Sequence, residues 1–338
     1  MKALDVRFAR HAAAAAWMKD AGSVIVGVSG GVDSMTLLHL LRFREGPPRI
    51  GLHAAHVDHR MREGSGEDAA WLEGICAEWD VPFHLERAPA PVASEAEGRR
   101  LRYRFFEEVR GRLGGGAVTM TAHTADDQAE TVLFRAARGS GPRGLGGIRA
   151  ERFPHVVRPL LPFRRAEIEA FAGEQGIPFR DDPTNLDPRW TRNRIRHAVL
   201  PALEQAVPGA SAALAALADT SRLEGAALEE LLDERIAVLS RPGPGPSGAP
   251  EAAPDTTSPS GFLLDRRALG ALSPPLLTLV LRRAAQRLGG DPGRAATAAL
   301  VSLVRDLPSG RRVDAGGGIV VENRSGIVAI RCCALRAR

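Results

Sequence analysis

Short apolar runs rich in β-branched residues alternate with longer amphipathic stretches through the first half of the chain. The apolar runs predict strands at residues 23–28, 50–57, 82–85, 117–121 and 155–157. Apolar positions spaced three and four apart predict helices at residues 34–43, 67–79, 95–110 and 126–138. Alternating strands and helices are typical of βαβ units, so we expect an α/β domain built on a parallel, Rossmann-like sheet.

The pattern becomes mostly helical beyond about residue 185. It predicts three long helices at residues 189–205, 210–239 and 274–288 and a small terminal hairpin at residues 311–330. Residues 241–261 are rich in Pro, Gly, Ser and Ala, and they predict a flexible insertion because few apolar groups offset the chain entropy lost on ordering. We therefore expect two domains, residues 1–205 and residues 206–338.

The composition of the 338 residues, 44% apolar and 25% charged, is typical of a soluble globular protein. The 45 basic and 40 acidic side chains give a net charge of +5, which suits a phosphate-rich partner but also occurs in proteins that bind no nucleic acid. Cys76, Cys332 and Cys333 have neither zinc nor disulfide spacing, which indicates a reducing compartment. Residues 1–22 predict an ordinary helix, and no apolar stretch approaches the roughly 20 residues of a membrane span. We expect a cytoplasmic protein with no membrane partner.

A glycine-rich turn follows the first predicted strand and directly precedes a helix. Its residues are Ser29, Gly30, Gly31, Val32, Asp33 and Ser34. Glycine lets backbone N–H groups approach a triphosphate, and a helix N-terminus attracts anions. We expect this turn to bind ATP, with Asp33 holding Mg²⁺ rather than touching phosphate. The alternative is a tight connection without a ligand, which such turns often are.

The second predicted strand ends in polar residues at the same edge of the sheet, where ligands of parallel sheets bind. His56, Asp58 and His59 are ligand types for a metal ion. No cysteine or distant carboxylate cluster completes a coordination shell, and successive side chains on a strand point in opposite directions. A metal site is therefore the weaker interpretation of these residues.

The fourth predicted strand leads into His123 and then a helix that begins with acids. Acids at a helix start are often simple caps, which accounts for Asp126. Capping does not account for His123, Asp127 and Glu130 gathering where ATP should lie. Asp127 and Glu130 are three residues apart on one helix face, so they could together bind an ammonium group or act as a general base toward an amine.

The S-G-G-x-D-S motif at residues 29–34 resembles the PP-loop, or ATP-pyrophosphatase, family, which cleaves ATP between the α- and β-phosphates. Over about residues 20–205, further motifs resemble the tRNA(Ile)-lysidine synthetases, in that family's order. They are HVDH at 56–59 followed by Arg60, E-x-x-x-R-x-x-R-Y at 95–103, H-x-x-D-D-Q-A-E-T at 123–131, RGSG at 138–141 with Gly144-Leu145, RPLL at 158–161, and DPTN at 182–185 followed by RNRIR at 192–196 and Pro201. The chain departs from the family pattern at Arg60 and Met61, and at Ala122 and Thr124 around His123.

The resemblance implies an enzyme that uses ATP to ligate L-lysine to C2 of the wobble cytidine in the CAU anticodon of tRNA(Ile). The reaction passes through an adenylated cytidine and changes the codon read from AUG to AUA. The implied site residues are, by role, Asp33, Arg99, His123 and Asp127 for catalysis, residues 29–34 and His56 for ATP, Asp127 and Glu130 for lysine, and Arg192, Asn193, Arg194 and Arg196 for tRNA.

Two other functions stay open at this point. A tRNA thiolase of the same superfamily would deliver sulfur, and the scarcity of cysteines argues against it. A regulatory nucleotide-binding module would have lost the chemistry, and the presence of Asp33, Asp127 and Glu130 argues against that. The sequence leaves open whether the chain forms a homodimer.

Overall fold

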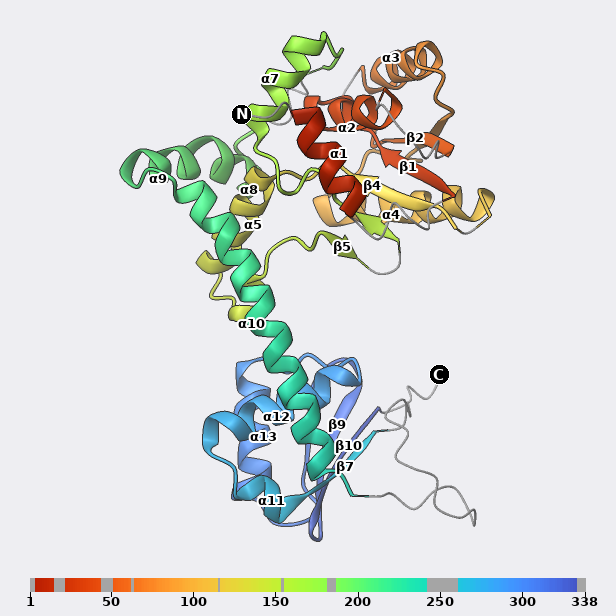
Figure 1. Cartoon of the computed structure of the whole chain (residues 1–338). Coiled ribbons are helices and arrows are strands. Elements are labelled where there is room, and N and C mark those ends of the chain that lie inside the picture. The colour runs from red at the N-terminus through yellow and green to blue at the C-terminus, as the bar shows by residue number, and fades with distance from the viewer. Residues whose placement is uncertain are drawn as a thin grey trace. The chain divides into compact units, whose positions relative to one another are not determined.

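The computed structural model describes residues 4–14, 22–43, 51–61, 64–114, 116–152, 155–180, 187–241 and 261–332. The chain divides into two compact units, Met1–Arg222 and Leu223–Arg338, and the division falls within helix α10 (Ala210–Leu239) (Figure 1). The D-P-T-N motif at 182–185 and residues 242–260 of the expected insertion lie outside the described residues. No helix in the described part of the chain is long and apolar enough to cross a membrane.

The first unit is built on a mostly parallel sheet, which confirms the predicted fold class. Within the described residues its strands are β1 (Ser23–Gly27), β2 (Gly51–Asp58), β3 (Phe83–Arg87), β4 (Val118–Thr121), β5 (Glu151–Arg152) and β6 (Val156–Val157). Their order is β3-β2-β1-β4-β6-β5, and only the edge pair β5–β6 among these strands is antiparallel. The carboxyl ends of β1, β2 and β4 therefore meet at one edge.

The helices of this part of the chain are α1 (Leu4–Ala14), α2 (Val32–Arg42), α3 (Ser65–Glu78), α4 (Glu95–Arg112), α5 (Ala125–Ala137), α6 (Pro142–Leu145) and α7 (Arg165–Gln175). Helix α4 packs on one face of the sheet, and α1, α2, α3 and α7 pack on the other. Val24 and Val26 of β1 pack into a core with α1, α2, α3 and α7, whereas Ile25 between them packs into a second core with α4. This alternation follows from the two-residue period of a strand, and it explains why β1 is apolar throughout.

The helix predicted at residues 189–205 is interrupted. It consists of α8 (Thr191–Arg194), a π-helical turn η3 (Ile195–Val199) and α9 (Leu200–Ala206). Leu200 donates its backbone N–H to Ile195, five residues back, and the next residue, Pro201, has no N–H to donate. Ile195 and Leu200 pack on Ala129 of α5, so this segment lies against the helix that begins with the predicted acids.

The second unit combines helices with an antiparallel sheet. Beyond α10 it contains β7 (Phe262–Asp265), α11 (Arg266–Gly270), α12 (Pro274–Arg287), α13 (Arg294–Arg305), β8 (Arg312–Asp314), β9 (Ile319–Arg324) and β10 (Ile327–Cys332). The sheet order is β7-β10-β9-β8. The predicted hairpin is present as β9 and β10, but the sheet is larger than expected because β7, a strand of four residues, pairs with β10.

Candidate active site

The loop between β1 and α2 is held in shape by its own serines. The Ser34 hydroxyl donates to the carbonyl oxygen of Gly31 (3.0 Å) and accepts from the backbone N–H of Ser29 (3.1 Å). The Ser29 hydroxyl lies 3.3 Å from that of Ser34. Gly30 has a backbone φ of +88°, a conformation that residues other than glycine rarely adopt. Ser29 and Ser34 thus fix the turn, and the glycines leave its backbone without side chains that would block a ligand.

Gly27, at the end of β1, permits a close approach of α4. A Cβ atom at Gly27 would lie 2.6 Å from Cζ of Phe106, closer than atoms can pack. Phe106 is buried and also lines the cavity described next. The glycine therefore sets the position of the α4 side of the site.

A cavity of about 910 Å³ opens at the carboxyl edge of the sheet. The sequence-predicted residues that line it are Ser29, Gly31, Val32, Asp33, Ser34, His56, His123, Asp127, Arg192, Asn193 and Arg196. The lining does not include Gly30, Arg99, Glu130 or Arg194 among the predicted residues. The volume is within the range of small-ligand sites.

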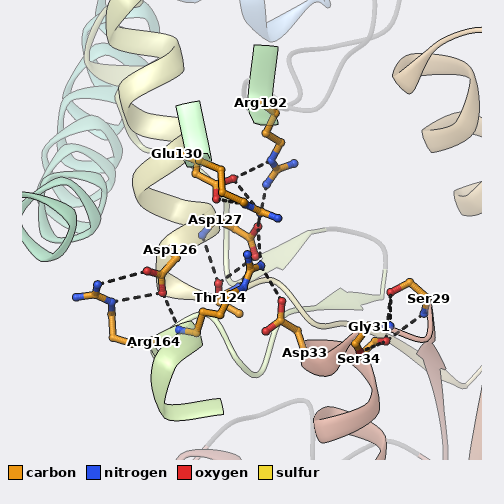
Figure 2. A network of polar contacts seen from close by, with 12 residues as sticks. Ser29, Gly31, Asp33, Ser34, Thr124, Asp126, Asp127, Glu130, Arg164 and Arg192 are labelled. Atoms are coloured by element: carbon orange, nitrogen blue, oxygen red, sulfur yellow. Dashed lines mark hydrogen bonds and ion pairs between the residues drawn. The ribbon is translucent and has the colours of Figure 1, made fainter. Parts of the chain in front are cut away.

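Asp127 and Glu130 share two arginines from the α8–η3 segment (Figure 2). Arg196 donates to Glu130 Oε1 (2.6 Å) and to Asp127 Oδ1 (2.8 Å). Arg192 donates to Glu130 Oε2 (3.1 Å) and to Asp127 Oδ1 (3.2 Å). In this structure guanidinium groups of the chain itself therefore occupy both acids.

A third arginine connects Asp127 to the loop between β1 and α2. Nη2 of Arg165, the first residue of α7, lies 2.7 Å from Asp33 Oδ2 and 3.8 Å from Asp127 Oδ1. Arg165 was not predicted from the sequence. A usable signal was present, because two carboxylates expected at one sheet edge require a neighbouring cation to remain charged.

Asp127 also caps α5, a role that we expected of Asp126. Asp127 Oδ2 accepts from the backbone N–H of Thr124 (2.8 Å), and the Thr124 hydroxyl accepts from the backbone N–H of Asp127 in return (3.3 Å). Asp126 instead accepts from the backbone N–H of Arg165 (2.7 Å) and from Arg164 (Figure 2). The expectation for Asp126 is corrected because Thr124 begins the helix, which puts Asp127 at the third position of the capping box.

The two aspartates of the site differ in protonation. Burial raises the pKa of Asp33 to about 6, with Arg165 opposing and Asp127 adding to the rise. Burial would also raise the pKa of Asp127, but the nearby basic groups, Arg192 foremost, outweigh it and lower the pKa to about 2. Asp127 is therefore ionised at neutral pH, whereas Asp33 gains a proton in mildly acidic solution.

One oxygen of Asp33 fits a metal ion. Oδ1 is buried and has no hydrogen-bond partner among the described residues. Mg²⁺ is usually held by one or two carboxylates together with substrate phosphates and water. The described residues contain no group of three or more His, Cys, Asp or Glu suited to a metal, which removes support for such a site at His56, Asp58 and His59.

His56 and His123, which line the cavity, are neutral, because burial lowers the pKa of each. His56 Nδ1 lies 2.8 Å from the carbonyl oxygen of Val28, which can only accept, so Nδ1 carries the proton. Burial lowers the pKa of His123 to about 3, with Arg158 among the cations that add to the shift. His123 Nδ1 lies 3.0 Å from the hydroxyl of Thr121. Both rings can exchange hydrogen bonds with a ligand without adding positive charge.

The remaining predicted residues have other contacts. Arg99 is exposed, and its guanidinium carbon lies 4.8 Å from the centre of the Tyr103 ring. Arg194 donates to the carbonyl oxygen of Pro188 (2.6 Å), and Asn193 donates to that of Asp187 (3.0 Å). These bonds hold the chain that precedes α8.

Comparison with known proteins supports the same family. The model of the PP-loop domain matches residues 4–203. A protein called tRNA(Ile)-lysidine synthase from Gloeobacter violaceus is 42% identical over 225 residues, which cover 65% of this chain and 69% of that protein. One of the same name from Thermotoga sp. (strain RQ2) is 37% identical over 213 residues, 61% of this chain and 51% of that protein. The chain thus spans about half the length of the Thermotoga relatives.

Among solved structures, the U34-tRNA thiolase NcsA from Methanococcus maripaludis, determined with its 4Fe-4S cluster, has a TM-score of 0.52. The two chains are 18% identical, and the match covers 64% of this chain and 76% of that one. At this identity the similarity shows the fold alone. The PP-loop domain matches residues 4–203, and the match to the Gloeobacter violaceus protein covers more than two thirds of that protein's length. The chain therefore belongs to the PP-loop family and, within it, to the tRNA(Ile)-lysidine synthases.

Proposed function

We propose that this protein is an ATP-dependent ligase that joins L-lysine to C2 of the wobble cytidine in the CAU anticodon of tRNA(Ile). The observation that supports the proposal best is that residues of the β1–α2 loop, including Asp33, line the same cavity as Asp127. Activation by ATP and capture of an amine need those two kinds of group within reach of one base.

The first step adenylates the base. ATP binds to residues 29–34 and His56, and O2 of the cytidine attacks the α-phosphate, so that an O–P bond forms and pyrophosphate leaves. Asp33 would hold Mg²⁺, which supplies positive charge to the phosphates when bound. The anionic groups of ATP would also meet Arg165, which lines the same cavity.

The second step transfers lysine. The side-chain ammonium must lose a proton before its nitrogen can attack C2, after which the bond from C2 to the AMP oxygen breaks. We assign Asp127 and Glu130 to binding this ammonium. Arg192 and Arg196 already bind both carboxylates, so lysine competes with guanidinium groups for them. The proton passes to solvent, because the lowered pKa of His123 makes that ring a weak base. We assign the neutral His123 ring, which lines the same cavity, to hydrogen bonding with the reacting groups.

The remaining assignments concern the RNA. We assign residues 1–205 to adenylation and residues 206–338 to tRNA binding, and the segment 192–196 to contacts with tRNA close to the reacting base. Arg194 is the exposed arginine of that segment, whereas Arg192 and Arg196 are partly buried against acids. Lysidine formation would change the codon read from AUG to AUA, and it would take place in the cytoplasm, where tRNA and ATP are available.

Sulfur transfer is less well supported as an alternative. Cys76 is buried, and burial raises the pKa of its thiol to about 11, so it is a poor nucleophile. Among the described residues no cysteine lines the cavity, and Cys332 belongs to the second unit. Cys333 lies outside the described residues.

The decisive experiment is mass spectrometry of unmodified tRNA(Ile) with a CAU anticodon after incubation with the protein, ATP, Mg²⁺ and isotope-labelled lysine. We expect the label on the wobble cytidine. Pyrophosphate release without label on the cytidine would show that the enzyme adenylates a substrate but uses another nucleophile or another RNA. ATP binding without any pyrophosphate release would contradict the ligase and support a regulatory nucleotide-binding module.

A further inference from the structure

Three arginines gather around Tyr103 at the border of the cavity. The guanidinium carbons of Arg99 and Arg152 lie 4.8 and 4.9 Å from the centre of the Tyr103 ring. Arg158 donates from Nη2 to the Tyr103 hydroxyl (3.3 Å). We call Arg99, Arg152, Arg158 and Tyr103 the arginine cluster.

The fold brings the cluster together from separate elements. Arg99 and Tyr103 are one helical turn apart on α4, Arg152 is on β5, and Arg158 directly follows β6. Arg158 is buried, and it donates from Nη1 to the carbonyl oxygen of Arg149 (2.6 Å). Its position is therefore fixed by the backbone, while the two exposed arginines rest on the ring.

The positive charge of the cluster has no carboxylate opposite it. Among the described residues, no ion pair joins Arg99, Arg152 or Arg158 to an acid. Burial lowers the pKa of Arg158, and Arg99 and Arg152 lower it further. Burial would raise the pKa of Tyr103, but the three arginines reverse the direction and lower it. Like charges are thus held close together, and a ring face, one phenol oxygen and the carbonyl oxygen of Arg149 offset them.

The cluster adjoins the cavity rather than a distant surface. The ring of Tyr103 packs edge-on against Phe106, with 6.1 Å between the ring centres, and Phe106 lines the cavity. Arg158 and Arg99 also lower the pKa of His123, which lines the cavity too. A ligand with its reactive part inside the cavity could place an attached anionic group against the cluster.

We propose that the arginine cluster binds a phosphodiester group of the RNA, next to the nucleotide whose base enters the cavity. A phosphate accepts paired hydrogen bonds from guanidinium groups, which match its geometry. The Tyr103 hydroxyl accepts from Arg158, so its own proton is available to a phosphate oxygen. The aromatic ring holds the guanidinium groups in place before the RNA arrives, which lowers the entropy lost on binding. The inference rests on the proposed function, because it takes the substrate to be RNA.

The test measures binding of unmodified tRNA to the full chain, without ATP or lysine, over a range of salt concentrations. We expect Arg152→Gln to weaken binding about three- to tenfold at low salt and to lower the salt slope by about one phosphate contact. Arg152→Lys keeps the charge and should keep the slope. Arg100→Gln is the matched control, because Arg100 is an exposed arginine of the same helix and should change neither quantity.

The second arm asks whether the cluster binds free phosphate instead, by measuring how strongly added pyrophosphate inhibits ATP turnover. If Arg152→Gln leaves the salt slope unchanged, or changes it no more than Arg100→Gln does, the RNA assignment is overturned. A change in pyrophosphate inhibition alone would overturn it in favour of a free anion. Thermal unfolding of each variant excludes misfolding as the cause. If the salt dependence of tRNA binding changes as expected but the protein transfers no lysine, the proposed ligase activity is contradicted and the RNA site at the arginine cluster is supported.

Discussion

Arg165 and Asp33 are joined by a hydrogen bond of 2.7 Å, from Nη2 to Oδ2, although 132 positions separate them in the chain. The bond leaves Oδ1 of Asp33 buried and without a partner in the described part of the chain. The carboxylate therefore uses one oxygen to connect the β1–α2 loop to α7, and its other oxygen is the one that we assign to Mg²⁺. This division is the basis of the first prediction.

Asp33→Ala should abolish pyrophosphate release and leave tRNA binding nearly unchanged. The substitution removes the proposed Mg²⁺ ligand, while the residues that we assign to RNA lie elsewhere. Glu174→Ala is a suitable control, because Glu174 is an exposed acid of α7. Pyrophosphate release by the alanine variant would show that Asp33 is not needed for adenylation.

The pH dependence of ATP use should follow the ionisation of Asp33. Because its pKa is raised to about 6, the carboxyl gains a proton and loses its charge as the pH falls through that value. We expect kcat/KM for ATP to rise with pH up to about 6 and then level off. A profile that stays flat down to pH 5 would contradict the assignment.

The same shift predicts an effect on stability. A carboxyl whose pKa is raised on folding stabilises the protein less as the pH rises. Asp33→Asn, which cannot ionise, should therefore gain stability relative to the wild-type protein as the pH increases through about 6. Thermal unfolding at several pH values measures the difference, and a constant difference would argue against a raised pKa.

Asp127→Asn should raise the KM for lysine about tenfold or abolish transfer, while pyrophosphate release continues. The substitution removes the charge that we assign to the lysine ammonium. Thr124→Ala is the matched control, because it removes the hydroxyl of the capping box and keeps the Asp127 carboxylate. The control should lose about 1 kcal/mol of stability and keep the lysine KM. Unchanged lysine kinetics in Asp127→Asn would place the amine elsewhere.

Gly27→Ala should destabilise the first unit by about 1–3 kcal/mol, since the new methyl group would overlap the Phe106 ring. Phe106→Leu should offset part of that loss in the double variant, although alone it removes buried surface. Chemical denaturation of both single variants and the double variant gives the coupling energy. Strictly additive effects would show that the two residues do not meet.

The sheet of the first unit could be predicted because its central strand β1 is buried on both faces. Val24, Ile25 and Val26 form an unbroken apolar run, which is a strong local signal. The π-helical turn at Ile195–Val199 was not predicted, because its side-chain pattern is that of an ordinary helix and only the backbone bonds reveal it. Strand β7 was missed because its short apolar run stands alone between the Pro- and Gly-rich stretch and a helix, without the repeated strand–helix alternation that identified the short strands of the first unit.

The site was predictable as a set of residues at one sheet edge, but the pairing of those residues was not. The sequence indicates that Asp33 and Asp127 lie near one another, since each follows a strand that ends at that edge. Arg192 was assigned to tRNA, and its contact with Asp127 was not predicted. Which acid meets which arginine depends on helix packing, and Arg165 was missed for that reason. Local patterns contain no record of contacts between distant helices.

Asp127 would be retained by selection for folding alone, because its Oδ2 closes the first turn of α5 while Oδ1 binds arginines. Glu130 makes no capping bond among the described contacts, and its oxygens meet Arg192 and Arg196. In a descendant that had lost the reaction, we therefore expect Glu130 to drift before Asp127 does. On that expectation, the glutamate, rather than the aspartate three residues before it, would distinguish a working enzyme from an inactive relative with the same fold.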